Sequence, residues 1–302
     1  MKKRKMNNAS RNNINALLFI SPWILGFLMF TVGPMVMSLY YSFTEYNIIN
    51  DPVWVGFKNY SVLFNDKLFW ISLSVTMRFA LMSLPIYLVV GYLIALLLNQ
   101  NVRWQNFWRA IFYLPSILSG VAVTMLWMRI LNPRLGWLNS LLDMINIKGP
   151  GWLHDPNWAI PALVIMGLWG VGGSMIIYLS GLQSVPTSLY DAAKIDGANP
   201  LQEFFHITIP MTSNVIFFNL VMGLISTFQY FTSAYIASGG QGGPARSTLF
   251  YNLYLYQNAF QFNSMGYASA MAWVLFIIIL IITLLVFRSS LSWVYYEGRP
   301  RR

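Results

Sequence analysis

Residues 247–287 read STLFYNLYLYQNAFQFNSMGYASAMAWVLFIIILIITLLVF and contain no Asp, Glu, Lys or Arg. About 20 apolar residues in a helix, at roughly 1.5 Å each, cross a hydrocarbon core of about 30 Å. The stretch is therefore long enough to hold one membrane-spanning helix.

Five further windows lack all four charged residue types: 12–44, 79–102, 110–128, 156–190 and 207–245. The 302 residues are 57% hydrophobic and only 9% charged, whereas a soluble domain carries about 25% charged residues. We therefore expect an all-α integral membrane protein with six transmembrane helices, one in each window. The expected spans are 15–41, 72–98, 107–130, 159–183, 213–237 and 263–287.

The distribution of Lys and Arg predicts the orientation, because these residues in short loops favour the cytoplasmic side. With the N-terminus inside, 12 of them lie in cytoplasmic segments and 5 in the opposite loops, while Arg78 and Arg129 lie inside spans. We predict cytoplasmic termini, with basic tails at 1–14 and 288–302 flanking one transmembrane domain at 15–287. The net charge of +10 then reflects this asymmetry and attraction to membrane lipid rather than binding of nucleic acid.

The N-terminal apolar stretch is expected to stay in the mature protein. It follows Lys2, Lys3, Arg4 and Lys5 and continues through residue 44 without a charge, whereas the apolar region of a signal peptide has about 7 to 15 residues. A convincing cleavage site of small residues is also missing.

The chain offers little for catalysis. It has no Cys, nine carboxylates and two His, and it contains no H-E-x-x-H, G-x-S-x-G or P-loop sequence. The glycine-rich run 239–244 lacks the Lys of a phosphate cradle. We therefore predict no catalytic residue, no metal site and no ATP site on this chain, and a membrane enzyme is disfavoured.

The polar segment 184–212, between the fourth and fifth spans, begins with a predicted short helix. Thr187 or Ser188 can cap it, and Ser188 with Asp191 resembles a capping box. Gly197 can adopt the left-handed conformation that ends such a helix.

A second short helix is expected after Gly197. Asn199 is a suitable cap, Pro200 occupies the first turn and Gln202 the third helical position. Pro210 is expected to end it. The segment is thus predicted as helix, tight turn and helix, held between two spans.

Three elements of this segment together carry a family resemblance: Asp191-Ala192-Ala193, Gly197-Ala198 and Ile207-Thr208-Ile209-Pro210. They resemble the E-A-A…G…I-x-L-P signature of inner-membrane subunits of binding-protein-dependent ABC importers, with Asp191 in place of Glu and Ile209 in place of Leu. The string L-Y-D-A-A-K-I-D-G-A at 189–198 looks like the carbohydrate-uptake branch, and G-F-K-N-Y at 56–60 looks like its first-type permease, the maltose and glycerol-3-phosphate kind. The matching elements are spread over 14–287.

The resemblance implies a set of partners. These are a second permease subunit, a pair of cytoplasmic ATPases that hold ATP and Mg, and an extracytoplasmic solute-binding protein, in a bacterial cell membrane. No cofactor is implied on this chain. The residues implied in ATPase coupling are Asp191, Ala192, Ala193, Asp196, Gly197 and Pro210. A helix tied rigidly to two spans can convey ATPase closure to the membrane helices.

The resemblance also implies that the sugar pathway runs past the middle of the fourth and fifth spans. Helical spacing places Met166, Trp169, Gly170 and Gly173 on one face, and Gly223, Ser226, Thr227 and Tyr230 on another. Sugars need hydroxyl partners and an aromatic face, and these residues supply both. The alternative is close helix packing, with Ser and Thr bonded to their own helix. Gln229 and Phe231 are substitutes if the helix is rotated.

Several alternatives stay open on sequence alone. Arg78 can extend to the outer interface or line the pathway. Trp137, Trp152 and Trp158, between the third and fourth spans, fit an interfacial aromatic belt or an amphipathic segment on the membrane, and we favour the belt. A secondary transporter or channel for a small polar solute is the main rival function, although its spans would be expected to bury ionisable residues.

Overall fold

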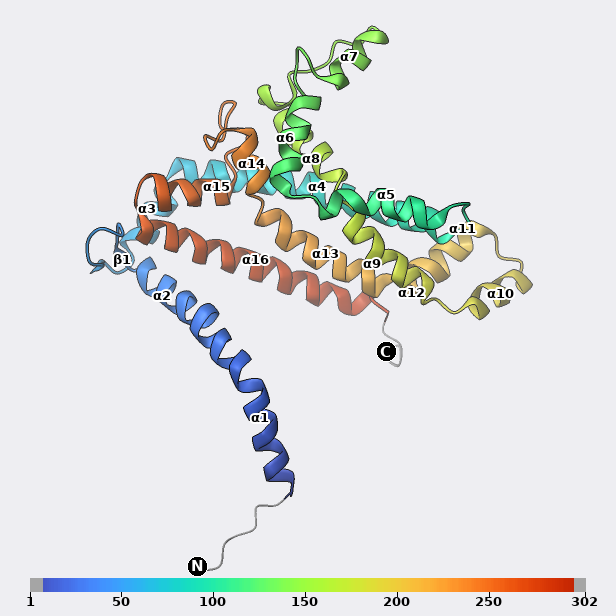
Figure 1. Ribbon diagram of the computed structural model, residues 1–302, viewed down its shortest axis with the longest axis horizontal. Helices are drawn as coiled ribbons and strands as arrows, with labels where there is room; N and C mark the ends of the chain where they lie inside the picture. The colour runs from blue at the N-terminus through green and yellow to red at the C-terminus, as the bar shows by residue number, and fades with distance from the viewer. Residues whose placement is uncertain (1–7, 296–302) are drawn as a thin grey trace, which may run out of the picture. The chain divides into compact units, whose positions relative to one another are not determined.

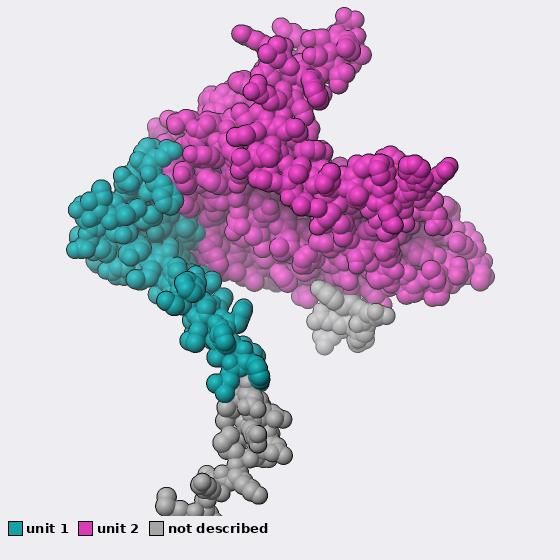
Figure 2. All heavy atoms as spheres, in the orientation of Figure 1, with its two compact units in different colours: residues 1–65, 258–274 teal, residues 66–257, 275–302 magenta. Residues whose placement is uncertain are grey.

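The computed structural model describes residues 8–295, and the side chains of residues 16–295. The ends of both predicted basic tails, 1–7 and 296–302, lie outside the described residues. The chain forms two compact units, residues 1–65 with 258–274 and residues 66–257 with 275–302, coloured teal and magenta in Figure 2.

The first unit holds the first predicted span. Helix α1 (Asn8–Phe27) continues through a π-helical turn (Leu28–Val32) into α2 (Gly33–Ser42). A two-stranded antiparallel hairpin of β1 (Thr44–Glu45) and β2 (Val53–Trp54) follows, and then α3 (Lys58–Asn65).

The G-F-K-N-Y element at 56–60 fastens this hairpin to the end of α2. Gly56 adopts a φ of +60°, which costs a residue without a side chain little. Lys58 pairs with Glu45 at 3.0 Å, and the Asn59 amide donates to the carbonyls of Ser42 and Thr44, both at 2.9 Å. The Tyr60 hydroxyl donates to Ser42 Oγ at 2.8 Å. The element therefore has a structural role where the first span ends.

Helix α4 (Lys67–Asn99) is the centre of the second unit. It is capped by Asp66, whose carboxylate accepts from the Leu68 N–H at 2.8 Å. It packs against α8 (Ala159–Leu168), α9 (Gly172–Gln183), α13 (Ser213–Phe228) and α15 (Tyr251–Tyr256). Its last turns share a buried cluster with α9, made of Tyr92, Ala95, Leu98, Met175, Tyr178, Leu179 and Leu182.

The third predicted span, 107–130, is not one continuous helix. Helices α5 (Gln105–Ile117) and α6 (Gly120–Ile130) meet at a bend of 100°. Leu118 and Ser119 between them have ψ of 147° and 131°, outside the helical range. Pro115, in the last turn of α5, also lacks an N–H for the helical ladder.

The fourth predicted span, 159–183, is bent as well, by 50° between α8 and α9. Gly172, the first residue of α9, lies so close to α5 that a Cβ there would overlap the carbonyl oxygen of Phe112. The missing side chain therefore lets α9 approach α5.

The remaining helices of the second unit are α7 (Trp137–Met144), a 3-10 turn (Trp152–His154), α10 (Thr187–Ile195), α11 (Pro200–Glu203), α12 (Ile209–Met211) and α14 (Thr232–Ala237). A π-helical turn at Gln257–Gln261 precedes α16 (Met265–Trp293). Within this unit α10 and α11 lie at one end and α15 at the other, while α7 stands away from α4 and α13 (Figure 1).

Among the described residues, four helices are long and apolar enough to cross a membrane: Ala16–Ser42, Lys67–Asn99, Ser213–Ala237 and Met265–Trp293. The number rises to six if each bent pair is one span. Ala16–Ser42 and Ser213–Ala237 agree with their predictions to within one residue, whereas Lys67–Asn99 begins five residues before the predicted 72 and Met265–Trp293 ends six residues after the predicted 287.

Candidate coupling segment and solute pathway

The first helix of the 184–212 segment begins without the predicted side-chain cap. Pro186 is the N-cap residue of α10, Thr187 is already helical, and no side chain caps the helix. The predicted capping box of Ser188 and Asp191 is therefore wrong, because Ser188 lies inside the helix. The exposed Asp191 carboxylate therefore accepts no capping hydrogen bond, and no partner for it lies among the described residues.

The end of α10 agrees with the prediction at Gly197. Its φ is +78°, its N–H bonds to the Lys194 carbonyl at 3.1 Å, and the Ala198 N–H bonds to the Ala193 carbonyl at 2.9 Å. This pair of bonds is a Schellman motif, which satisfies carbonyls at a helix end. Asp196 is the C-cap residue and is exposed.

The second predicted cap is also confirmed. The Gln202 N–H bonds to Asn199 Oδ1 at 2.9 Å, and the Asn199 N–H bonds to Gln202 Oε1 at 2.8 Å, a complete capping box with Pro200 in the first turn.

The expectation that Pro210 ends the second helix is wrong. The chain passes from α11 through a π-helical turn (Phe204–Thr208) into α12, with Pro210 in its first turn. Pro210 has no N–H to donate, and the π-helical turn directly before it is where the regular helical hydrogen-bond register is interrupted. The coupling segment therefore continues into α13 with only Thr212 between α12 and α13.

Hydroxyl groups connect this segment to α4. The Tyr190 hydroxyl on α10 is hydrogen-bonded to Thr208 Oγ1 at 3.0 Å, and Thr212 Oγ1 donates to the Thr208 carbonyl at 2.7 Å. The Tyr92 hydroxyl on α4 is hydrogen-bonded to Thr212 Oγ1 at 2.8 Å. Phe204 also packs against the buried cluster around Tyr92. We did not predict these contacts, because their residues lie up to 120 positions apart.

The outer face of the segment combines acidic and apolar side chains. Asp191, Ala192 and Asp196 are exposed, whereas Ala193 and Pro210 are partly buried. Four large apolar side chains are exposed beside them: Leu189, Ile195, Leu201 and Phe205, of which Ile195 is 87% exposed. We call these exposed residues the coupling surface. Several exposed apolar side chains on the same short segment as a free carboxylate are typical of a protein interaction site.

In the fourth span, the bend interrupts the predicted helical face. Met166 is buried in α8, whereas Trp169 and Gly170 lie in the break between α8 and α9. The Trp169 side chain is 37% exposed and meets Trp127 edge to face, with ring centroids 6.2 Å apart. A Cβ on Gly173 would have no atom within 4 Å. These residues thus surround an irregular turn and not one continuous helical face.

In the fifth span, the predicted pathway residues Gly223 and Thr227 make contacts that are typical of helix packing. A Cβ on Gly223 would lie 2.6 Å from Leu84 Cδ1, and the buried Thr227 hydroxyl donates to the Leu224 carbonyl at 2.9 Å. Ser226 is exposed. Tyr230 lies beyond the end of α13, so it does not continue the predicted helical face.

The Tyr230 ring is enclosed by other aromatic rings. Its centroid lies 4.4 Å from that of Phe79 and 5.0 Å from that of Phe250. Gln229, the neighbouring substitute, is exposed. The fifth-span set therefore divides into residues that pack inside the chain and residues that are exposed.

Residues 87–294 match the family described as binding-protein-dependent transport system inner membrane component. This chain belongs to that family. The match includes the coupling segment and both bent helix pairs. It confirms the resemblance inferred from Asp191 to Pro210, and it makes the chain a multi-pass membrane transport subunit rather than an enzyme.

Relatives agree with this membership over nearly the whole chain. The probable ABC transporter permease protein YesP of Bacillus subtilis is 44% identical over 299 residues, covering 98% of this chain and 96% of the relative. The lactose transport system permease protein LacF of Rhizobium radiobacter is 34% identical and covers 92% and 94%. A chain of a bacterial alginate ABC transporter, solved with a pentasaccharide-bound periplasmic protein, has the same fold with a TM-score of 0.79 at 23% identity, covering 95% and 97%.

Proposed function

We propose that this family member is the permease subunit that passes a sugar or oligosaccharide through the membrane by alternating access. ATP is hydrolysed on a separate pair of cytoplasmic ATPase subunits, a second permease completes the pathway, and a solute-binding protein delivers the sugar from outside. The sugar specificity is supported by the carbohydrate-type string at 189–198 and by the lactose-transporting relative.

The observation that carries the proposal is the coupling surface. Its exposed carboxylate, Asp191, has no partner among the described residues, and Leu189, Ile195, Leu201 and Phe205 of the same segment are exposed as well. A cytoplasmic ATPase with a cation opposite Asp191 and an apolar groove would satisfy both features.

The path from this surface into the membrane starts at α10. Hydrogen bonds between the hydroxyls of Tyr190 and Thr208, from the Thr212 hydroxyl to the Thr208 carbonyl, and between the hydroxyls of Thr212 and Tyr92 link α10 to α4. Displacement of α10 by a closing ATPase would therefore move α4 and α13 together, as rigid-body rocking requires.

The same end of the second unit supports the proposed orientation, with six spans and both termini in the cytoplasm. Leu98, near the end of α4, packs in one cluster with Leu182, near the end of α9, and with Phe204 of the coupling segment. Arg103, just beyond α4, then lies on the cytoplasmic side together with Lys194, as the distribution of basic residues favours.

For the sugar, Trp169 and Gly173 are the strongest pathway residues. The Trp169 ring is partly exposed at the break in the fourth span, and Gly173 faces open space. An indole face beside open space can stack on a sugar ring. Gly170 beside Trp169, the exposed Ser226 of α13 and the hydroxyl of the otherwise enclosed Tyr230 complete the proposed set, with Gly223 and Thr227 holding the helices behind it.

The test replaces Asp191 with Ala and uses Asp143→Ala, an exposed carboxylate on α7, as the control. If Asp191 pairs with a cation on the ATPase, its loss costs about 2 to 5 kcal/mol, so association or coupling falls at least about tenfold. Binding-protein-dependent uptake per inserted subunit and the ATPase retained on purification are measured. Full uptake and retention in Asp191→Ala, or ATP hydrolysis by this chain alone, would contradict the proposal.

A further inference from the structure

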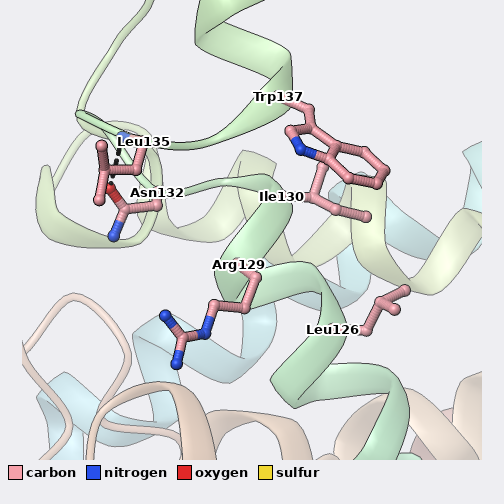
Figure 3. A pocket seen from close by; sticks show the side chains of 6 residues that line it. All are labelled: Leu126, Arg129, Ile130, Asn132, Leu135 and Trp137. Carbon is pink, nitrogen blue, oxygen red and sulfur yellow. Dashed lines mark hydrogen bonds between the residues drawn. The ribbon is translucent and has the colours of Figure 1, made fainter.

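A cavity of about 340 Å³ lies between the last turn of α6 and the start of α7, within the second unit. It is lined by Leu126, Arg129, Ile130, Asn132, Leu135 and Trp137. Figure 3 shows Trp137, Ile130 and Leu126 on one side and Asn132 with Leu135 on the other, and the Arg129 guanidinium turns away from Trp137. Most of the wall is therefore apolar, with one cation.

The Arg129 guanidinium lacks a counter-ion. It has no ion-pair or hydrogen-bond partner among residues 8–295, and no Asp or Glu occurs between residues 67 and 142. An arginine stays protonated and presents a planar fork of donors that fits a phosphate or carboxylate. The guanidinium is exposed and is therefore free to pair with an anion from outside the chain.

The neighbouring helix α7 exposes an apolar face. Trp137, Leu141, Met144 and Ile145 are all exposed, Trp137 by 76%, and their spacing of four, seven and eight residues places them on one side of the helix. Arg134 and Lys148 flank this face. Apolar side chains with basic residues beside them are typical of a helix lying in a membrane interface.

The opposite side of α7 is fixed by Asn139. Its amide donates to the carbonyls of Pro133 and Pro150 at 3.0 and 3.2 Å, and the buried Trp152 indole donates to Asn139 Oδ1 at 2.6 Å. The aromatic belt favoured from sequence is therefore wrong for Trp152, which is only 5% exposed. Because these hydrogen bonds hold the Asn139 side of α7 against Pro133, Pro150 and Trp152, the apolar side of the helix faces away from them.

We propose that this cavity binds the headgroup of an anionic phospholipid, with the phosphate on Arg129, the glycerol region against Leu126, Ile130 and Trp137, and the α7 face in the membrane interface. A sugar fits less well, because its hydroxyls would meet mostly apolar walls. The inference rests on the membrane location of the family and is independent of the coupling surface. The proposed orientation would place the lipid in the outer leaflet.

The test compares Arg129→Gln with Arg246→Gln, which removes the same charge from another exposed arginine of the second unit that neither lines the cavity nor flanks α7. The full chain, purified with its partner subunits, is delipidated and titrated with phosphatidylglycerol or phosphatidylcholine, and bound lipids are counted by native mass spectrometry. Loss of a charge-assisted hydrogen bond should weaken phosphatidylglycerol binding about tenfold in Arg129→Gln. Arg246→Gln should bind like wild type.

A second variant, Leu126→Phe, fills part of the cavity and keeps the cation, so it should also release the lipid while retaining the charge. It keeps the test decisive if Arg129→Gln inserts poorly. Equal losses in both arginine variants would reduce the effect to general attraction of anionic lipid and overturn the site. Wild-type binding in Arg129→Gln and Leu126→Phe, or displacement of the lipid by millimolar inorganic phosphate, would overturn it as well.

Discussion

The coupling segment and the bends in the third and fourth spans differ in where their geometry is encoded. Between Ala193 and Gln202, each turn is set by residues a few positions apart, in a Schellman motif and a capping box. At 118–119 and 169–171, the chain leaves the helix although the sequence on both sides is apolar and helical in pattern. Short-range hydrogen bonds act in the first region, and packing between distant helices acts in the second.

Substitutions in the coupling segment are therefore expected to act locally, whereas substitutions at the bends are expected to act through tertiary contacts. A change at a cap alters the backbone within one turn. A change at a bend alters how α9 approaches α5, or how Trp169 meets Trp127, while the local propensity stays the same. Four variants with matched controls separate the two kinds of effect.

Gly197→Val should have the largest effect. A Cβ there meets no atom within 4 Å, so the whole cost comes from the φ of +78°, about 1 to 2 kcal/mol or more for a branched residue. The second helix is then misdirected, and uptake per inserted subunit should fall at least tenfold. Gly197→Asn, which tolerates this conformation better, should keep most of the uptake, and equal uptake in the two variants would remove the left-handed turn from coupling.

Gly172→Ala should lower the stability of the inserted protein, because the new methyl group overlaps the Phe112 carbonyl. Such overpacking costs about 1 to 3 kcal/mol. Gly173→Ala, one residue later in open space, should unfold at the wild-type temperature. Thermal unfolding of both variants in detergent is the measurement, and indistinguishable midpoints would mean that α9 does not need its close approach to α5.

Trp169→Ala should weaken sugar uptake by about 1.5 kcal/mol, roughly tenfold in apparent affinity, if the ring stacks on the solute. Trp169→Phe keeps an aromatic face and should recover much of the loss. Tyr230→Phe keeps the ring between Phe79 and Phe250 and tests the hydroxyl without opening a cavity. Unchanged uptake kinetics in Trp169→Ala would place the sugar contact elsewhere.

Asn199→Ala and Ser188→Ala should differ although both residues are predicted caps. Loss of the Asn199 capping box costs about 1 kcal/mol, whereas Ser188 caps nothing in the structure, so its removal should leave stability unchanged. The unfolding midpoint of each variant decides, and a destabilised Ser188→Ala would restore the capping box expected from sequence.

The sequence by itself determined the membrane class, the family and the turns of the coupling segment. Charge-free windows predict spans because an apolar helix needs no partner to enter lipid. Gly197 and Asn199 predict their turns because the left-handed conformation and the cap depend on the residue itself and on its near neighbours.

Only the tertiary structure decided the bends, the packing and exposure of the predicted pathway residues, and the continuation through Pro210. Gly172 and Pro115 hint at irregularity, but glycine and proline are also tolerated inside straight membrane helices. The bends depend on how closely α5 approaches α9, and the enclosure of Tyr230 depends on Phe79 and Phe250, which lie far away in the chain. Helical periodicity describes one helix at a time, whereas these features are set by contacts between helices.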